Sequence, residues 1–331
     1  MIDQPRSLAV LTGGYSAEAP VSRKSAAMVM ANIDRARWSP TLVHIDPDGW
    51  WAELPGFDAR FPIDRVDFSV ALPDGGRLLF DKVLIMVHGT PGENGRLQAY
   101  FEMIGMPHTN GSPRSMALTF HKGWTTTLLL SHNIAVARSV VLFPGDPLPD
   151  PSAHEGFPCF VKPNEAGSSF GVSRVETAAD LQPAIDHAFA ECTEEGNILV
   201  EAFLPGREFS VGVIPSAADW RQPEALPVTE IIAEGAFFDY AAKYQGASQE
   251  ITPADIPAEV AAEMQATALA VYRVTECRGL ARVDMKWTPG GPPAVIEVNT
   301  VPGFTEHSLV PQQAAYIGLT RTELINRILG N

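Results

Sequence analysis

The sequence predicts a multi-domain protein of the α/β (α+β) class whose N-terminal domain contains a parallel sheet. A chain of 331 residues can bury more than one hydrophobic core. Over the first 120 residues, short apolar segments alternate with helical patterns, as they do in parallel sheets with crossover helices. Near the C-terminus, polar and apolar residues alternate with a period of two on both sides of a Pro/Gly-rich turn, which predicts a pair of strands.

The first 120 residues contain the clearest alternation of strands and helices. We expect strands at residues 8–11, 41–45 and 82–87, and helices at residues 22–33 and 97–104. Glu18 and His88 each follow the end of a predicted strand. Functional groups of such sheets lie at the carboxyl ends of the strands, so these two side chains are candidates for a site.

The rest of the chain divides into a central and a C-terminal part. We expect helices at residues 122–130, 178–190 and 321–329, and strands at residues 160–163, 172–175 and 198–203. The predicted domains are residues 1–121, 122–208 and 209–331. Residues 46–80 match no functional motif.

Charge and composition narrow the class of protein. The net charge is −15, from 24 basic and 39 acidic residues, which disfavours nucleic acid or an anionic membrane as a partner. The sequence contains no apolar run as long as a membrane span and no signal-peptide pattern at its N-terminus. The three cysteines form neither a disulfide framework nor a zinc motif, so we expect a cytoplasmic protein.

Two C-terminal segments predict a metal site. In each, polar residues stand two apart, so Arg282 and Asp284 share one strand face, and Glu297 and Asn299 share another. Pairing these strands would gather two carboxylates, an amide and a guanidinium. Oxygen ligands of this kind suit Mg²⁺, which usually also binds substrate phosphates. The alternative is a pair of half-buried strands with polar outer faces.

A loop in the central part predicts a phosphate site. The loop at residues 167–171 is short and rich in hydroxyl groups, and its backbone amides could surround phosphates. Lys162 ends the preceding strand and could reach the same phosphates. A tight hairpin loop is the alternative. Neither the P-loop motif nor the dinucleotide-binding glycine motif is present, which disfavours a P-loop ATPase and a nicotinamide enzyme.

Four groups of motifs, in this order, carry a family resemblance. They are residues 13–22, residues 88–95, residues 160–163 with 167–173, and residues 281–284 with 297–305 and 307–311. Residues 238–244 fit the lid segment of the same family. In order and spacing, the chain resembles the D-alanine–D-alanine ligases of the ATP-grasp superfamily. The resemblance implies a three-domain ATP-grasp fold that holds ATP between its central and C-terminal domains.

The resemblance also implies the ATP and metal ligands. Lys122, Lys162, Ser169 and Lys243 would lie in the ATP site with its phosphates, Glu201, Phe203 and Leu204 would face adenine, and Glu208 would hold the ribose. Asp284, Glu297 and Asn299 would hold two Mg²⁺, for which Mn²⁺ could substitute.

The implied chemistry has two steps. The carboxylate of a first D-alanine attacks the γ-phosphate of ATP, and the amine of a second D-alanine then displaces phosphate from the acylphosphate. Glu18 and His88 would bind the first D-alanine, and Ser308 and Leu309 would bind the carboxylate of the second. Arg282 and the Gly303 N–H would stabilise the oxyanion. Ser168, Tyr244 and Glu18 would close the lid. The base for the incoming amine stays open between the Tyr244–Ser168–Glu18 chain and a phosphate oxygen.

Other activities compatible with these motifs remain as alternatives. A related ligase could use D-lactate, D-serine or another amino acid as second substrate. An ATP-binding sensor without turnover is a rival from another class, although Arg282 and the three metal ligands are all present. The resemblance further implies a role in peptidoglycan precursor synthesis and a homodimer.

Overall fold

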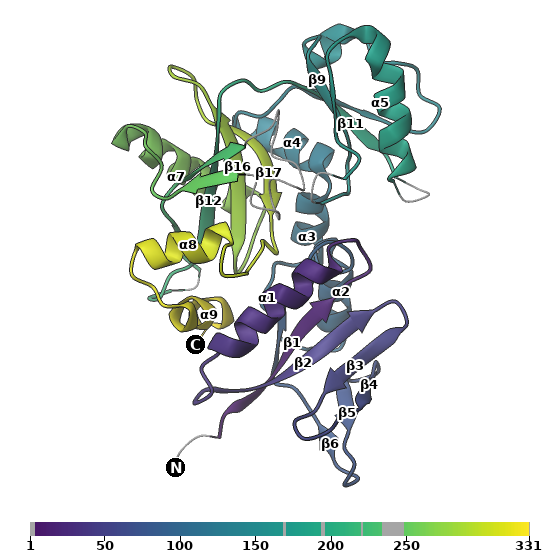
Figure 1. Ribbon diagram of the computed structural model, residues 1–331, viewed down its shortest axis with the longest axis vertical. Coiled ribbons are helices and arrows are strands. Elements are labelled where there is room, and N and C mark those ends of the chain that lie inside the picture. The colour runs from purple at the N-terminus through teal and green to yellow at the C-terminus, as the bar shows by residue number, and fades with distance from the viewer. Residues whose placement is uncertain (1–3, 168–169, 193–195, 220, 234–247, 331) are drawn as a thin grey trace.

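The computed structural model describes residues 4–167, 170–192, 196–219, 221–233 and 248–330. Its strands form three sheets, which lie in three lobes of the molecule (Figure 1). Among the described residues, no helix has the length and apolar content needed to cross a membrane.

The N-terminal sheet has a parallel part, as the sequence predicts. Strand β1 (Arg6–Gly13) pairs in parallel with both β2 (Trp38–Asp46) and β7 (Lys82–Ile85). Helix α1 (Ala19–Asn32) follows β1 and buries Ala26 and Val29 against this sheet. The turn between them directs residues 14–18 towards the carboxyl ends of the strands.

An antiparallel ribbon extends this sheet, which the sequence did not predict. Strands β3 (Gly49–Glu53), β4 (Arg60–Asp64), β5 (Ser69–Ala71) and β6 (Arg77–Leu78) follow β2 in order of pairing. Short turns join these strands, so each reverses direction without a crossover helix. The complete N-terminal sheet is therefore mixed.

Three helices lead from the N-terminal sheet to the central lobe. They are α2 (Arg96–Met103), α3 (Pro113–Phe120) and α4 (Lys122–Ser131). The Ser112 side chain caps α3 by accepting from the Ser115 N–H, and the His121 ring caps α4 by accepting from the Trp124 N–H. Capping satisfies amides that the first turn leaves unpaired, which explains the break between α3 and α4.

The central lobe is a four-stranded antiparallel sheet in the order β10-β9-β11-β8. Its elements are β8 (Ser139–Leu142), the 3₁₀ helix η1 (Pro151–His154), β9 (Cys159–Pro163), β10 (Ser173–Val175), α5 (Ala178–Ala190) and β11 (Ile198–Ala202). Helix α5 has the bounds that the sequence predicts, and its buried face packs on the sheet.

The C-terminal lobe is an antiparallel sheet in the order β15-β14-β12-β16-β17, with β13 also paired to β12. Its elements are β12 (Arg207–Pro215), β13 (Pro223–Ala225), β14 (Thr229–Ala233), β15 (Ser248–Ile251), α7 (Ala258–Val274), β16 (Ala281–Trp287), β17 (Ala294–Asn299), α8 (Leu309–Tyr316) and α9 (Arg321–Leu329).

The N-terminal and C-terminal lobes share one hydrophobic core. Leu8 and Val10 of the first sheet lie in the same buried cluster as Ile214, Phe304 and Val310. In Figure 1, α1 accordingly lies beside α9. This common core fixes the two lobes relative to each other, so side chains from both can form one site. The domain boundaries at residues 121 and 208 stay a prediction.

Candidate functional site

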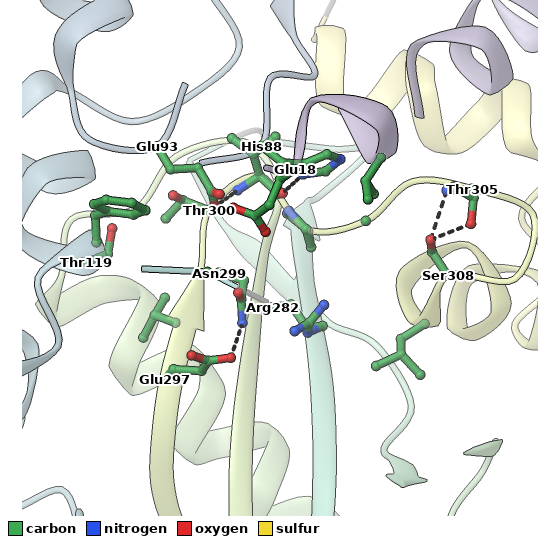
Figure 2. Close-up of a pocket in the computed structure, with 18 of the residues that line it drawn as sticks. Glu18, His88, Glu93, Thr119, Arg282, Glu297, Asn299, Thr300, Thr305 and Ser308 are labelled. Atoms are coloured by element: carbon green, nitrogen blue, oxygen red, sulfur yellow. Dashed lines mark hydrogen bonds between the residues drawn. The ribbon is translucent and has the colours of Figure 1, made fainter. Parts of the chain in front are cut away.

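A cavity of about 350 Å³ lies where the three lobes meet. Figure 2 shows side chains that converge on it from the N-terminal loops and from strands of the C-terminal sheet. The predicted site residues that line it are Glu18, His88, Lys122, Arg282, Glu297, Asn299, Gly303, Ser308 and Leu309. Residues more than 200 positions apart in the sequence thus share one pocket.

The two C-terminal strands pair as the sequence predicts. In the antiparallel β16–β17 ladder, Arg282 stands opposite Asn299, and Asp284 stands opposite Glu297. A bulge between Asp284 and Met285 interrupts the register directly beside these residues. The polar side chains therefore lie on one face of the sheet.

Hydrogen bonds hold these side chains together. Both Arg282 Nε and a terminal nitrogen of its guanidinium donate to the Asp284 carboxylate, at 2.6–3.2 Å. Ser210 Oγ donates to Asp284 Oδ1 at 2.7 Å, and Asn299 Nδ2 donates to Asp284 Oδ2 at 3.0 Å and to Glu297 Oε1 at 3.5 Å. Asp284 is nearly buried, and these donors stabilise its charge.

The donor set fits a magnesium ion that shares its ligands with a bound phosphate. Within the described ranges, no three His, Cys, Asp or Glu side chains are clustered tightly enough to hold a metal by themselves. Asp284 and Glu297 supply carboxylate oxygens, and Asn299 places an amide beside both. Hard-cation sites of this size are usually completed by water and substrate phosphates.

Glu18 lies at the N-terminal end of α1, one residue before the helix begins. Its side chain is almost buried and lines the cavity. The backbones of Gly89 and Gly167 approach so closely that a methyl group at either position would overlap the Glu18 carboxylate. The backbone at Gly167 therefore lies directly against the Glu18 carboxylate, and a side chain at this position would displace that carboxylate.

His88 links the N-terminal lobe to the C-terminal lobe. Its Nδ1 lies 2.6 Å from the Val301 carbonyl oxygen, and its Nε2 lies 2.9 Å from Ser25 Oγ. Because a carbonyl can only accept, Nδ1 carries the proton, and Nε2 accepts from the Ser25 hydroxyl. Burial lowers the pKa of His88, although Glu18 opposes this effect, so the ring stays neutral. With both nitrogens engaged, the ring can contact a substrate through its edge; its predicted substrate role stays a prediction.

Glu93 makes a second link that the sequence analysis did not identify. Its carboxylate accepts the Gly89 N–H at 2.7 Å and the Val301 N–H at 3.1 Å, and it lines the cavity. Burial, followed by repulsion from Glu18, raises the pKa of Glu93 to about 8. Glu93 lies inside the motif at residues 88–95, but its role depends on a contact 208 positions away, which no local pattern reveals.

The N-terminus of α8 forms another wall of the cavity. Ser308 stands immediately before the helix, and its Oγ accepts the Thr305 N–H at 2.8 Å. Gly303 and Leu309 line the same wall. A helix N-terminus with free backbone amides favours an anion, so this wall suits a carboxylate.

Apart from Lys122, the predicted nucleotide residues that the structure describes do not line this cavity; they lie on or beside strands of the central and C-terminal sheets. Lys162 Nζ lies 2.6 Å from Glu201 Oε1, and Lys286 Nζ lies 3.0 Å from Glu208 Oε2. The Phe203 ring stacks near Phe160, with the Arg174 guanidinium over its face. These residues supply charged groups for the phosphates and ribose of a nucleotide and an aromatic ring for its base. The role of each residue stays a prediction.

Lys122 and Leu204 differ in their surroundings. Lys122 Nζ donates to the Ala166 carbonyl oxygen at 2.5 Å and reaches the cavity, whereas Leu204 is half-buried outside it. Four predicted residues lie outside the described part of the chain: Ser168, Ser169, Lys243 and Tyr244.

Family models and curated relatives with the same description match this chain over most of its length. A family model described as D-ala D-ala ligase N-terminus matches residues 7–111, and one described as D-ala D-ala ligase C-terminus matches residues 148–330. The D-alanine–D-alanine ligase of Flavobacterium johnsoniae is 40% identical over 326 residues, covering 98% of both chains. That of Phocaeicola vulgatus is 39% identical over 328 residues, covering 98% of this chain and 99% of the relative.

Solved structures agree with the sequence relatives. The VanG D-Ala:D-Ser ligase from Enterococcus faecalis has a TM-score of 0.86 and 30% identity, with 99% of both chains covered. A D-alanine–D-alanine ligase from Bacillus anthracis complexed with ATP has a TM-score of 0.75 and 25% identity, with 98% of this chain and 96% of that chain covered.

Proposed function

The chain belongs to the D-alanine–D-alanine ligase family, and from this premise we propose that it joins two D-alanines, with ATP converted to ADP and phosphate. The observation that carries the proposal is the meeting of Glu18, Arg282, Glu297 and Ser308 around one cavity. These side chains supply an ammonium partner, an oxyanion donor, a metal ligand and a carboxylate receptor.

In the first step, the chain has to bring the carboxylate of D-alanine to the γ-phosphate. Glu18 pairs with the ammonium group of this D-alanine, which fixes its carboxylate towards the sheet. Lys122 and Lys162 hold phosphate oxygens as point charges. Bound Mg²⁺, held by Asp284, Glu297 and Asn299, would neutralise charge on the phosphates.

In the second step, the amine of another D-alanine attacks the carbonyl carbon of the acylphosphate. Ser308 and the amide of Leu309 bind its carboxylate at the α8 N-terminus. Arg282 and the Gly303 N–H donate to the oxygen that becomes negative, and inorganic phosphate leaves. Exclusion of water from this cavity would protect the acylphosphate from hydrolysis. The dipeptide would serve peptidoglycan precursor synthesis.

The structural similarity to a D-Ala:D-Ser ligase makes D-serine the strongest competing second substrate. Purified protein should be incubated with Mg²⁺-ATP and equal concentrations of D-alanine, D-serine and D-lactate at neutral pH. Mass analysis should find D-alanyl-D-alanine as the main product. A predominant D-alanyl-D-serine or D-alanyl-D-lactate mass would reject the proposed second substrate and retain the ligase.

A further inference from the structure

One acidic side chain of the cavity has no role in the proposed reaction. The acidic residues that line the described part of the cavity are Glu18, Glu93, Glu250 and Glu297. Glu18 faces the first substrate in the proposal, both Glu93 oxygens accept backbone N–H groups, and Glu297 belongs to the metal site. Glu250 on β15 remains unassigned.

Sheet pairing sets Glu250 on the same face as the oxyanion and metal residues. Glu250 stands opposite Ile231 on β14, Ile231 stands opposite Glu208 on β12, and Glu208 stands opposite Lys286 on β16. Lys286 shares its strand face with Asp284 and Arg282, because side chains two residues apart point to the same side. The Glu250 carboxylate therefore belongs to the catalytic face of the sheet.

Helix α8 brings Glu250 close to the proposed receptor of the second carboxylate. Gln312 Nε2 donates to Glu250 Oε2 at 2.7 Å, and the Gln312 N–H donates to the Ser308 carbonyl oxygen at 3.2 Å. Gln312 thus lies one helical turn from Ser308. Among the residues that the structure describes, none donates to Glu250 Oε1, so this oxygen can accept a proton.

We propose that Glu250 is the catalytic base that takes a proton from the amine of the second amino acid; this deepens, and rests on, the proposed ligase function. That amine lies two bonds from the carboxylate that Ser308 binds, and Glu250 is hydrogen-bonded to Gln312, which lies one helical turn from Ser308. The ammonium group gives one proton to Glu250, and the freed nitrogen lone pair forms a bond to the acylphosphate carbonyl carbon. The carbon–oxygen bond to phosphate then breaks, inorganic phosphate carries away the electron pair, and the second proton of the attacking nitrogen passes to this phosphate, which leaves a neutral peptide N–H.

The electrostatic surroundings of Glu250 suit this role. Burial raises the pKa of Glu250, while the hydrogen bond from Gln312 and the charges of Arg282 and His307 oppose the rise. A carboxylate with a raised pKa is a stronger base at neutral pH, which favours proton transfer from an ammonium group. As pH falls through this raised pKa, Glu250 becomes protonated and dipeptide formation should decline.

Hydroxylamine separates the two steps of the reaction. It is uncharged at neutral pH, so it attacks an acylphosphate without a protein base and yields D-alanine hydroxamate. Glu250→Gln keeps the size of the side chain and an oxygen that accepts from Gln312, but it removes the basic carboxylate. We expect this variant to lose roughly 10²-fold or more in dipeptide formation, the usual worth of a general base, while hydroxamate formation stays within about threefold of wild type. The residual dipeptide rate should also lose the decline at low pH.

The matched control is Glu259→Gln, on the exposed face of α7, which should leave both products at wild-type rates. Dipeptide formation by Glu250→Gln near the wild-type rate would overturn the inference and assign the proton to another acceptor. Loss of both products in Glu250→Gln would also overturn it, since the residue would then support the site's structure. If wild-type protein forms neither product, the proposed ligase function itself fails.

Discussion

Replacing Arg282 with methionine tests the proposed oxyanion site most sharply. The change removes two donors from the Asp284 carboxylate, whose side chain is 8% exposed. Removing one partner of a buried ion pair costs about 3–5 kcal/mol. Ser210 and Asn299 still donate to Asp284, so we expect the lower end of this range. Stabilities of 5–15 kcal/mol are usual for a folded domain, so the variant should remain folded.

The effect on turnover should exceed the effect on folding. Loss of one oxyanion donor commonly lowers kcat by roughly 10²–10³. ADP release at saturating D-alanine and ATP measures turnover, and urea unfolding measures stability. Both should be determined on the same preparation of Arg282→Met.

Arg207→Met provides a control with similar chemistry outside the cavity. Arg207 also forms a two-point ion pair, at 2.6 Å for each contact, with the nearly buried Glu230. It should lose stability but keep turnover within about threefold of wild type, because Arg207 is remote from the proposed oxyanion. Near-normal turnover in Arg282→Met would refute the reasoning. So would a loss of turnover in Arg207→Met as large as that in Arg282→Met.

Three further substitutions test other parts of the site. The pKa of Glu93 is about 8 in the folded chain, against a reference value of 4.5, so the folded state holds the proton more tightly than the unfolded state. The stability of the wild-type protein should therefore fall as pH rises between these two values. Glu93→Gln should lack that slope in urea midpoints measured from pH 5 to 8, and an unchanged slope would contradict the assignment. Ser308→Ala should raise KM for the second D-alanine about tenfold, because one hydrogen bond to a charged group is lost. An unchanged KM would contradict the role proposed for Ser308. Gly167→Ala should lower kcat/KM for D-alanine roughly 10²-fold through displacement of Glu18, and wild-type kinetics would contradict the steric argument.

The sequence was most informative where function imposes a local pattern. The alternation at Arg282–Asp284 and Glu297–Asn299 predicted both the strand pair and its common polar face, because the side-chain period of a strand is two. Helix α5 also has the predicted bounds, since its apolar residues recur with helical spacing.

Long-range contacts explain what the sequence did not predict. Glu250 enters the site through pairing across β14 and β12, and Glu93 through a hydrogen bond to Val301. The ribbon β3–β6 consists of strands of two to five residues with irregular burial, too short for a clear periodicity. His88 was correctly located at a strand end, but its two ring partners come from distant segments.

The stoichiometry of the reaction tests the central claim most directly. Purified protein should be given Mg²⁺-ATP with D-alanine, with L-alanine or without amino acid, and ADP, phosphate and peptide should be measured together. We predict release that depends on D-alanine, with ADP, phosphate and D-alanyl-D-alanine formed in equal amounts. ADP release that is independent of D-alanine, or ATP binding without any release, would contradict the ligase function proposed for this cavity.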